Sequence, residues 1–327
     1  MCHKLKYIAS LNDDIYFNLA VEEYVFNNFK DDSYLLFWKN DKSLVLGKYQ
    51  NVFEEINIKA AENLDIKVAR RNSGGGTVFH DQGNLNYSFI KDYNPNSFVD
   101  YDVFLNPVIS ALESLGINAA KKRTSDIAID GKKISGSAQA IAGGRILHHG
   151  TLLFDTDLSM LHDLLKTAEG EFTSNAVKST RSQVTNIKEH IANHAMTIDE
   201  FQTLLLKTMF PEGIQEVEFS GQDWAAIRNL SQSKYSTWAW NYGNSPRFSY
   251  VKESTLGGAS VSLSLQVENG IIVQCEVLKG QLPVNNIEDA VRGLRYSYTV
   301  INNRLNELLS KSNAEEIDVA KLALCFF

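Results

Sequence analysis

The sequence has very little cysteine: three residues in 327, namely Cys2, Cys275 and Cys325. Their spacing matches no metal-binding pattern, and three cysteines are too few for a disulfide framework. This scarcity excludes a disulfide-stabilised secreted class and is typical of the reducing cytoplasm. We therefore expect a cytoplasmic protein.

Long apolar runs and blocks of like charge are missing as well. No run approaches the roughly 20 apolar residues that span a bilayer, and the first residues lack the apolar core of a signal peptide. The net charge is −7, with both signs dispersed along the chain. Neither a membrane nor nucleic acid is therefore expected as the main partner. We expect a monomer.

Two common phosphate-binding motifs, G-x-x-x-x-G-K-[ST] and G-x-G-x-x-G, are also absent. What the chain has is residues 68–81, which read Val-Ala-Arg-Arg-Asn-Ser-Gly-Gly-Gly-Thr-Val-Phe-His-Asp. Three consecutive glycines lose much backbone entropy and fill no core, so they are best tolerated where bare backbone approaches a ligand. Their N–H groups can cradle an anion that Arg70 and Arg71 neutralise. The alternative is a flexible turn with two solvated arginines.

A chain of this length predicts two domains, or one large domain with an appendage. We place the boundary where the character of the sequence changes, giving domains at residues 1–243 and 244–327. The second is a small α+β module without evident chemistry. It reads as three strands and a helix, at residues 247–251, 261–267, 271–277 and 287–309. An Asn269-Gly270 turn joins the last two strands.

The first helix begins with Asn12 or Asp13 as its N-cap. Glu22 and Glu23 on this helix can be read as paired catalytic carboxylates. We favour the solvated edge of the helix, because adjacent residues do not face each other.

Two further stretches have a clear period. Residues 84–90 alternate as a strand, with Leu85, Tyr87 and Phe89 on one face and Asn86 and Ser88 on the other. Residues 104–115 are apolar at helical spacing, and that helix either starts near Asn106 or bends at Pro107. This apolar periodicity indicates core and says nothing about ligands.

A second informative stretch covers residues 125–139. Asp130-Gly131 predicts a two-residue hairpin turn, so Lys132 and Lys133 open the returning strand and face opposite ways. Four small residues follow and leave room for a buried ligand: Ser135, Gly136, Ser137 and Ala138. The alternative is an exposed hairpin with solvated lysines.

A third hairpin turns at Gly143-Gly144 and returns through His148 and His149. These histidines diverge on a strand and have no other ligand at metal spacing, so one of them is expected to line the core or a pocket. Residues 173–187 form either a loop that closes on an anionic ligand with Lys178 and Arg181, or a plain connector. A capping box at residues 197–200 starts another helix.

In chain order, these stretches resemble the signature motifs of the lipoate–protein ligases. Residues 70–81 resemble the lipoate-binding loop, residues 132–138 the second signature with Lys133 at the essential lysine, and residues 148–153 the third. Residues 179–186 resemble the adenylate-binding loop, and residues 238–246 the entry to the C-terminal accessory domain. The matches cover nearly the whole chain. They imply an α+β fold of mixed and antiparallel sheets packed with helices, as in the biotin and lipoate ligases, plus a small α+β C-terminal domain.

The resemblance implies a two-step reaction with ATP, lipoate and Mg²⁺. Lipoate attacks the α-phosphate of ATP to give lipoyl-AMP and pyrophosphate, and a lysine of a lipoyl domain then displaces AMP. The implied carriers are the acyltransferase subunits of 2-oxo-acid dehydrogenases and the glycine-cleavage H protein. No protein nucleophile is required, since positioning and charge stabilisation suffice.

The resemblance also assigns residues. Those for ATP and adenylate are Arg71, Gly76, Thr77, Val78, Phe79, Lys133 and Arg181. Those for lipoate are Arg70, Ser73, Gly74, Gly75, Lys133, Ser135, Gly136 and His149. The Lys133 ammonium would bridge the lipoyl carbonyl oxygen and the phosphate. Asp126 would orient Lys133 or help to hold Mg²⁺, unless it is a plain carboxylate at a strand edge.

Several rival functions remain. A lipoyltransferase that uses preformed lipoyl-AMP, or passes the acyl group between carrier proteins, would share the fold without activating lipoate with ATP. Octanoyltransferases work through a cysteine thioester, and the site motifs here contain no cysteine. Biotin ligases carry a G-R-G-R loop that this chain lacks. A non-catalytic module that binds nucleotide or lipoyl domains is disfavoured by the intact Lys133 segment.

Overall fold

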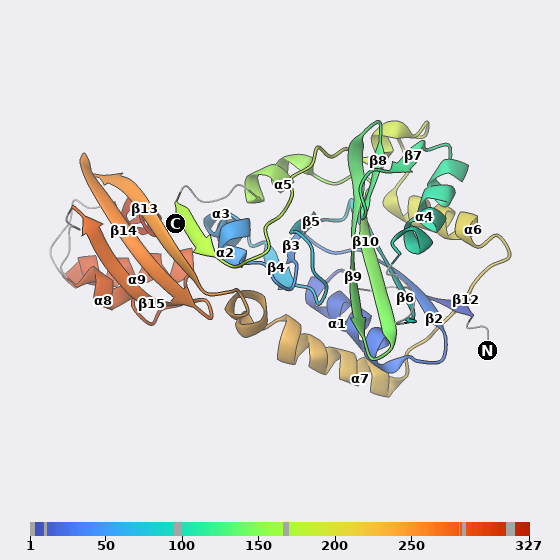
Figure 1. Cartoon of the computed structure of the whole chain (residues 1–327), viewed down its shortest axis with the longest axis horizontal. Coiled ribbons are helices and arrows are strands. Elements are labelled where there is room, and N and C mark those ends of the chain that lie inside the picture. The colour runs from blue at the N-terminus through green and yellow to red at the C-terminus, as the bar shows by residue number, and fades with distance from the viewer. Residues whose placement is uncertain are drawn as a thin grey trace. The chain divides into compact units, whose positions relative to one another are not determined.

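The computed structural model describes residues 4–9, 12–94, 100–165, 170–280, 282, 286–311 and 318–327. Cys2 lies outside these residues. Backbone contacts divide the chain into two compact units. The first comprises Met1–Lys48, Ala69–Ser159 and Thr180–Ser236, and the second comprises Tyr49–Val68, Met160–Ser179 and Thr237–Phe327. Each unit is an α+β arrangement of a sheet with helices (Figure 1), which confirms the predicted fold class.

The first unit is built on an eight-stranded mixed sheet of order β12-β1-β2-β6-β10-β9-β8-β7. β1 pairs in parallel with β2 and β12, and the remaining pairs are antiparallel. The strands are β1 Leu5–Ala9, β2 Ser33–Trp38, β6 Asn84–Asp92, β7 Ala119–Lys121, β8 Asp126–Ile129, β9 Lys132–Ala142, β10 Arg145–Leu153 and β12 Gln215–Glu216. The helices are α1 Ile15–Asn28, α4 Asp102–Ser114, α6 Ile198–Met209 and α7 Gly221–Leu230, with short turns η1 Ile187–His190 and η2 Ser231–Tyr235.

The two faces of this sheet differ in chemistry. On one face Leu85, Tyr87 and Phe89 of β6 pack in a core with residues of α4 and α6, as the alternation predicts. On the other face Asn86 and Ser88 are also buried. Ser88 donates a hydrogen bond to Glu22 of α1. A polar face that is nevertheless buried, because a helix covers it, is where a site can be built.

A small sheet of order β4-β3-β5 carries the glycine-rich stretch. Its strands are β3 Ser43–Leu46, β4 Lys67–Arg70 and β5 Val78–His80. The loop of residues 71–77 joins β4 to β5, so the glycines sit between two short, buried strands.

The second unit holds an antiparallel sheet of order β11-β13-β14-β15. Its strands are β11 Glu171–Ser174, β13 Phe248–Leu256, β14 Ala259–Glu268 and β15 Ile271–Lys279. The helical elements are α2 Val52–Glu55, α3 Ile58–Asn63, α5 Leu158–Leu164 (whose first two residues belong to the first unit), η3 Ala239–Gly243, α8 Ile287–Val291, α9 Tyr298–Lys311 and α10 Val319–Leu324. Phe53 of α2 packs on Phe248 and Tyr296, with ring centroids 5.5 and 5.1 Å away. Residues far earlier in the sequence therefore complete the core of this unit.

The local turn signals are confirmed. Asp130 and Gly131 have φ values of +48° and +75°, and residues 143–144 and 269–270 are likewise positive at both positions. Positive φ at both central residues is what a type I′ hairpin requires. The capping box between Thr197 and Glu200 is present at the start of α6.

Three helix predictions were wrong in detail. The N-cap of α1 is Asp14, whose side chain accepts from the Phe17 N–H, rather than Asn12 or Asp13. α4 starts at Asp102 rather than near Asn106 and runs through Pro107, because burial of its apolar face outweighs the lost hydrogen bond. The alternative of a bend at Pro107 stays a prediction.

The predicted helix over residues 287–309 is interrupted between α8 and α9. Gly293 has a φ of +82°. Its N–H and the Leu294 carbonyl bond to the backbone of Ile272 in β15. Pairing with the sheet edge therefore competes with, and here replaces, continued helix.

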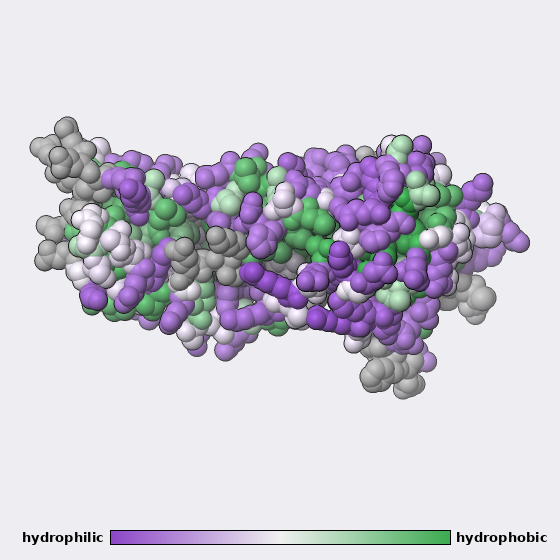
Figure 2. Space-filling model, turned by 90° about the horizontal axis from the view of Figure 1, so that it is seen from above, coloured by the Kyte–Doolittle hydropathy of each residue, from purple (hydrophilic) through white to green (hydrophobic). Residues whose placement is uncertain are grey.

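Among the described residues, no helix is long and apolar enough to cross a bilayer. The face shown in Figure 2 mixes hydrophilic residues with scattered hydrophobic patches.

Candidate functional site

Arg71 holds the glycine loop in shape. Its guanidinium donates hydrogen bonds of 2.6–3.0 Å to Val45 O, Ser73 Oγ, Gly74 O and Gly76 O. Burial lowers the Arg71 pKa to about 10, with the charge of Glu22 opposing the shift, so the group stays a cation at neutral pH. In this structure Arg71 serves the loop itself, and its contact with phosphate stays a prediction.

Close backbone contact explains why the loop lacks side chains. A Cβ at Gly47, just after β3, would lie 2.1 Å from the Gly75 carbonyl oxygen, so any side chain there would clash. Gly75 itself has a φ of +90°, which other residues rarely adopt. Arg70 is fully buried and donates to the Gly47 carbonyl at 3.1 Å. Burial lowers the Arg70 pKa to about 10. Arg70 therefore fixes the backbone just after β3, against which the loop packs.

A buried polar chain ties Ser73 of the loop to α1. His149 Nε2 lies 2.6 Å from Ser73 Oγ, and His149 Nδ1 lies 2.8 Å from Glu22 Oε1. Ser88 donates to the same Glu22 oxygen at 2.6 Å. The interpretation of Glu22 as solvated was wrong, because only 3% of it is exposed. The sequence signal was the polar face of the strand at Asn86 and Ser88, because polar side chains that become buried need a hydrogen-bonding partner on the element that covers them.

Lys133 lies in β9 with its ammonium directed along the strand. Lys133 Nζ is 2.8 Å from Asp126 Oδ1, across the β8–β9 hairpin. A Cβ at Gly136 would come within 2.6 Å of that nitrogen. Gly136 therefore provides the space that the ammonium occupies, while neighbouring Lys132 is exposed.

The ammonium and the glycine loop reach the same face of β9. A Cβ at Gly75 would lie 3.7 Å from the Ala138 Cβ. Gly136 and Ala138 are two residues apart, so they share a face of the strand about 7 Å from each other. His149 is the cross-strand partner of Ala138 and also lies on this face. The structure thus gathers Lys133, the loop and His149 around one short stretch of strand.

Other predicted residues lie elsewhere or deeper. Ser135 is fully buried and neighbours the Tyr87 hydroxyl, so it belongs to the face of β9 opposite Gly136. Thr77 and Phe79 are buried at the start of β5, and Val78 is half-buried. The structure therefore does not bring the Ser135 side chain to the face that carries the ammonium.

The segment after β11 reaches Lys133 through its main chain. The Lys133 N–H donates to the Gln183 carbonyl at 2.8 Å, and the Thr185 N–H donates to the Lys133 carbonyl at 3.1 Å. Exposed Arg181 lies two residues before Gln183 in the first unit. Lys178 belongs to the second unit and pairs there with Glu54 at 2.6 Å. The two cations predicted to act together thus fall in different units.

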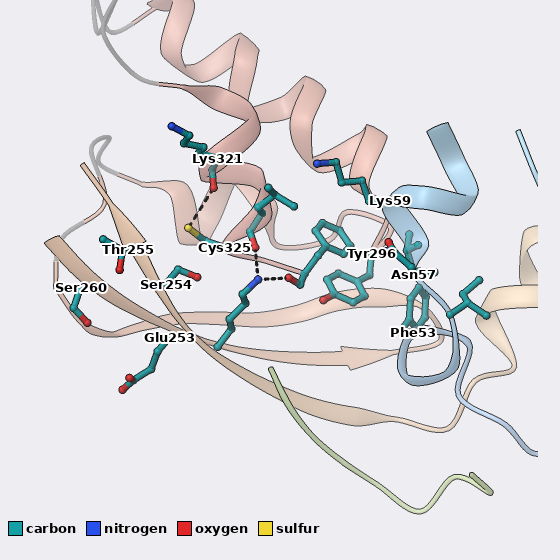
Figure 3. Close-up of a pocket in the computed structure, with 15 residues that line it drawn as sticks. Phe53, Asn57, Lys59, Glu253, Ser254, Thr255, Ser260, Tyr296, Lys321 and Cys325 are labelled. Atoms are coloured by element: carbon teal, nitrogen blue, oxygen red, sulfur yellow. Dashed lines mark hydrogen bonds between the residues drawn. The ribbon is translucent and has the colours of Figure 1, made fainter. Parts of the chain in front are cut away.

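The second unit has a cavity of about 650 Å³ between β13, α3 and α10 (Figure 3). Lys252 lines it, and its ammonium donates to the Leu324 carbonyl at 3.0 Å and to the Phe327 carbonyl. We assign this cavity no role in the chemistry. In the part of the chain that the structure describes, no three His, Cys, Asp or Glu side chains gather as metal ligands.

Comparison with known families identifies the class. The family described as lipoyl protein ligase A/B catalytic domain matches residues 14–210, and the bacterial lipoate protein ligase C-terminus matches residues 245–326. The chain therefore belongs to the lipoate–protein ligases, a family of enzymes, as the resemblance predicts.

Individual relatives are similar over most of their length. Lipoate–protein ligase 1 of Staphylococcus aureus is 38% identical, covering 93% of this chain and 94% of that protein. Lipoate-protein ligase LplJ of Bacillus subtilis is 40% identical, covering 87% and 88%.

Three solved structures are similar to about three quarters of the chain. A lipoate-protein ligase A bound with ATP is 29% identical with a TM-score of 0.62, covering 75% of this chain and all of that one. A putative Thermoplasma acidophilum ligase with bound lipoic acid is 28% identical with a TM-score of 0.61, covering 74% and 100%. A bi-partite ligase from that organism, described with its E2 lipoyl domain, is 28% identical with a TM-score of 0.63, covering 75% and 97%.

Proposed function

We propose that this enzyme activates free lipoate with ATP and then lipoylates a lysine of a lipoyl domain. A lipoate carboxylate oxygen bonds to the α-phosphorus of ATP as pyrophosphate leaves. The carrier amine then attacks the acyl carbon, and AMP leaves with the electrons of the C–O bond. The observation that carries the proposal is the approach of the Lys133 ammonium and the glycine loop to one face of β9.

Each residue has a role that its position supports. The Lys133 ammonium stabilises the charge that develops between the acyl oxygen and the phosphate. Asp126 orients that ammonium, since one of its oxygens already bonds to Lys133 Nζ. The N–H groups of Gly75, Gly76 and Thr77 hold the phosphate, and Arg71 keeps the loop in shape and supplies positive charge. Arg181 contacts the adenylate from the segment that pairs with Lys133.

Lipoate lies on the buried polar face of the sheet in this proposal, beside Ser73, Gly136 and His149. Arg70 contributes by holding the backbone at Gly47, and Gly74 contributes as part of the loop backbone. Val78 and Phe79 supply apolar contact. The Ser135 side chain is better placed to pack against Tyr87 than to contact ligand.

Mg²⁺ would enter bound to ATP and would neutralise phosphate charge. The residues present fit this poorly as a resident metal site, because Asp126 is the carboxylate at hand and it is committed to Lys133. Asp126 is therefore assigned to Lys133 rather than to a metal ion.

Of the similar structures, one is described with bound ATP, one with bound lipoic acid and one with an E2 lipoyl domain. These descriptions support ATP, lipoate and lipoyl domains as the ligands of this enzyme. We propose a monomer of the cytoplasm that modifies 2-oxo-acid dehydrogenase subunits and the H protein. Residues 1–243 would do the chemistry and residues 244–327 would be accessory.

Exchange of labelled pyrophosphate into ATP tests the activation step. A ligase shows exchange that requires lipoate, and it then transfers labelled lipoate to a lipoyl domain. A lipoyltransferase would modify the carrier from supplied lipoyl-AMP but show no exchange. That result would overturn the proposed activation.

A further inference from the structure

We propose that Glu23, Lys234 and Tyr235 are positioning residues for the glycine loop and act through Asn72. This inference rests on the proposed function and adds residues to it. Asn72 directly precedes Ser73, so its side chain is a second point, beside Ser73, at which the loop can be held just before the glycines. All of these residues belong to the first unit.

The contacts form a closed ring. Asn72 Nδ2 donates to the Tyr235 hydroxyl at 2.7 Å, and that hydroxyl donates to Glu23 Oε2 at 2.6 Å. Lys234 Nζ donates to both Glu23 oxygens, at 2.9 and 2.7 Å, and to Asn72 Oδ1 at 3.0 Å. Both ends of the Asn72 amide are therefore fixed, which also sets its orientation.

Neighbouring residues of α1 hold neighbouring residues of the loop. Glu22 reaches Ser73 through His149, and Glu23 reaches Asn72 through Tyr235 and Lys234. The interpretation of Glu23 as a solvated edge was wrong, because its carboxylate is largely buried in this ring. Burial alone would raise the pKa of Glu23, but hydrogen bonds from Lys234 and Tyr235 hold it below its ordinary value.

A loop of bare glycines needs such external support. Residues 74–76 carry no side chains, so the cradle can keep its shape only through its flanks and Arg71. Loss of the ring should leave the fold and the reacting groups intact but let the loop sample other shapes. Such an enzyme binds ligand more weakly while its bound complex still reacts.

The test compares Tyr235→Phe and Lys234→Met with Tyr24→Phe. Tyr24 of α1 is a matched control. Its hydroxyl also donates a hydrogen bond to a carboxylate, that of Asp223 in α7, but this contact does not involve the loop. We expect the KM for lipoate in pyrophosphate exchange to rise about tenfold in the first two variants, with kcat within about threefold of wild type. Calorimetric Kd for lipoate should rise in parallel, and Tyr24→Phe should match wild type in both. Lys234→Arg should recover most of the loss.

Pairwise combination sharpens the result. Asn72→Ala with Tyr235→Phe should weaken lipoate binding no further than the stronger single variant, because both act on one contact. Unchanged KM and Kd in folded Tyr235→Phe and Lys234→Met, or additive effects in the double variant, would overturn the proposal. Absence of exchange in wild type would instead overturn the proposed function, and lipoate Kd would still decide the role of the ring.

Discussion

At the scale of single residues, two cations of the proposed site are held by neighbours: Lys133 pairs with Asp126, and Arg71 bonds to the carbonyls of Gly74 and Gly76. Lys133 could be placed from sequence because the hairpin turn predicts its strand position, while its role in the chemistry stays a prediction from the resemblance. Glu22 and Glu23 could not, because the helix pattern shows which residues are near the core but not which polar partner meets them. Their partners come from residues 72, 149 and 234–235, far away in sequence.

Lys133→Ala should abolish adenylate formation while the fold survives. Removing a preorganised group that stabilises developing charge costs roughly 10² to 10³ in kcat. The measurement is lipoate-dependent pyrophosphate exchange, with a thermal melt to confirm folding. Lys132→Ala is the matched control, since that lysine is exposed on the same strand. Near-normal turnover in Lys133→Ala would remove the residue from this role.

His148 predicts a pH dependence of stability. Burial lowers its pKa from 6.5 to about 3 in the folded protein, and His80 shows the same shift. The unfolded chain therefore binds more protons between those values, so the free energy of unfolding falls as the pH drops below about 6.5. His148→Gln should flatten this fall in denaturant titrations from pH 7 to pH 5. Exposed His162→Gln should leave it unchanged, and equal slopes in all three proteins would contradict the assignment.

At the scale of elements, turns and periodic runs were predictable because their causes are local. Hairpins at residues 130–131 and 269–270 follow from positive-φ residues, and the capping box of α6 follows from its own side chains. The break between α8 and α9 was not predictable, because Gly293 and Leu294 bond to β15. Likewise, the face of Ser135 depends on strand register, which the spacing of small residues does not set.

Strand β9 supplies a direct test of the ammonium's place. In Gly136→Ala the added Cβ would meet Lys133 Nζ at 2.6 Å, and that flexible group would have to move. We expect adenylate formation to fall at least tenfold with a loss of stability below about 1 kcal/mol, because a side-chain end yields easily. Gly221→Ala is the control, since its Cβ would meet nothing within 4 Å. Wild-type exchange rates in Gly136→Ala would show that the ammonium acts from another position.

At the scale of the whole molecule, the compact units do not follow the order of the sequence. The second unit takes in residues 49–68 and 160–179 as well as the C-terminal residues. A composition change marks where a module begins, but it cannot reveal earlier segments that pack with it. The domain boundary at residue 243 therefore stays a prediction from the sequence.

A chain ending at residue 243 should be less stable than the whole protein. Its Phe53 would lose Phe248 and Tyr296, and exposing a buried phenylalanine costs about 1.5–3 kcal/mol. We expect a lower melting temperature and binding of a hydrophobic dye. Phe53→Ala in the whole protein should shift the melt in the same direction. An unchanged melt in the shortened chain would mean that residues 49–68 do not need the C-terminal residues.

The central claim is that the glycine loop and the Lys133 ammonium hold one acyl–phosphate junction. A crystal structure with a non-hydrolysable lipoyl-adenylate analogue measures this directly. We predict Lys133 Nζ and the N–H groups of residues 75–77 within hydrogen-bond distance of the same acyl phosphate. An analogue bound away from β9, or one held by the loop while the Lys133 ammonium bonds only to Asp126, would contradict the account.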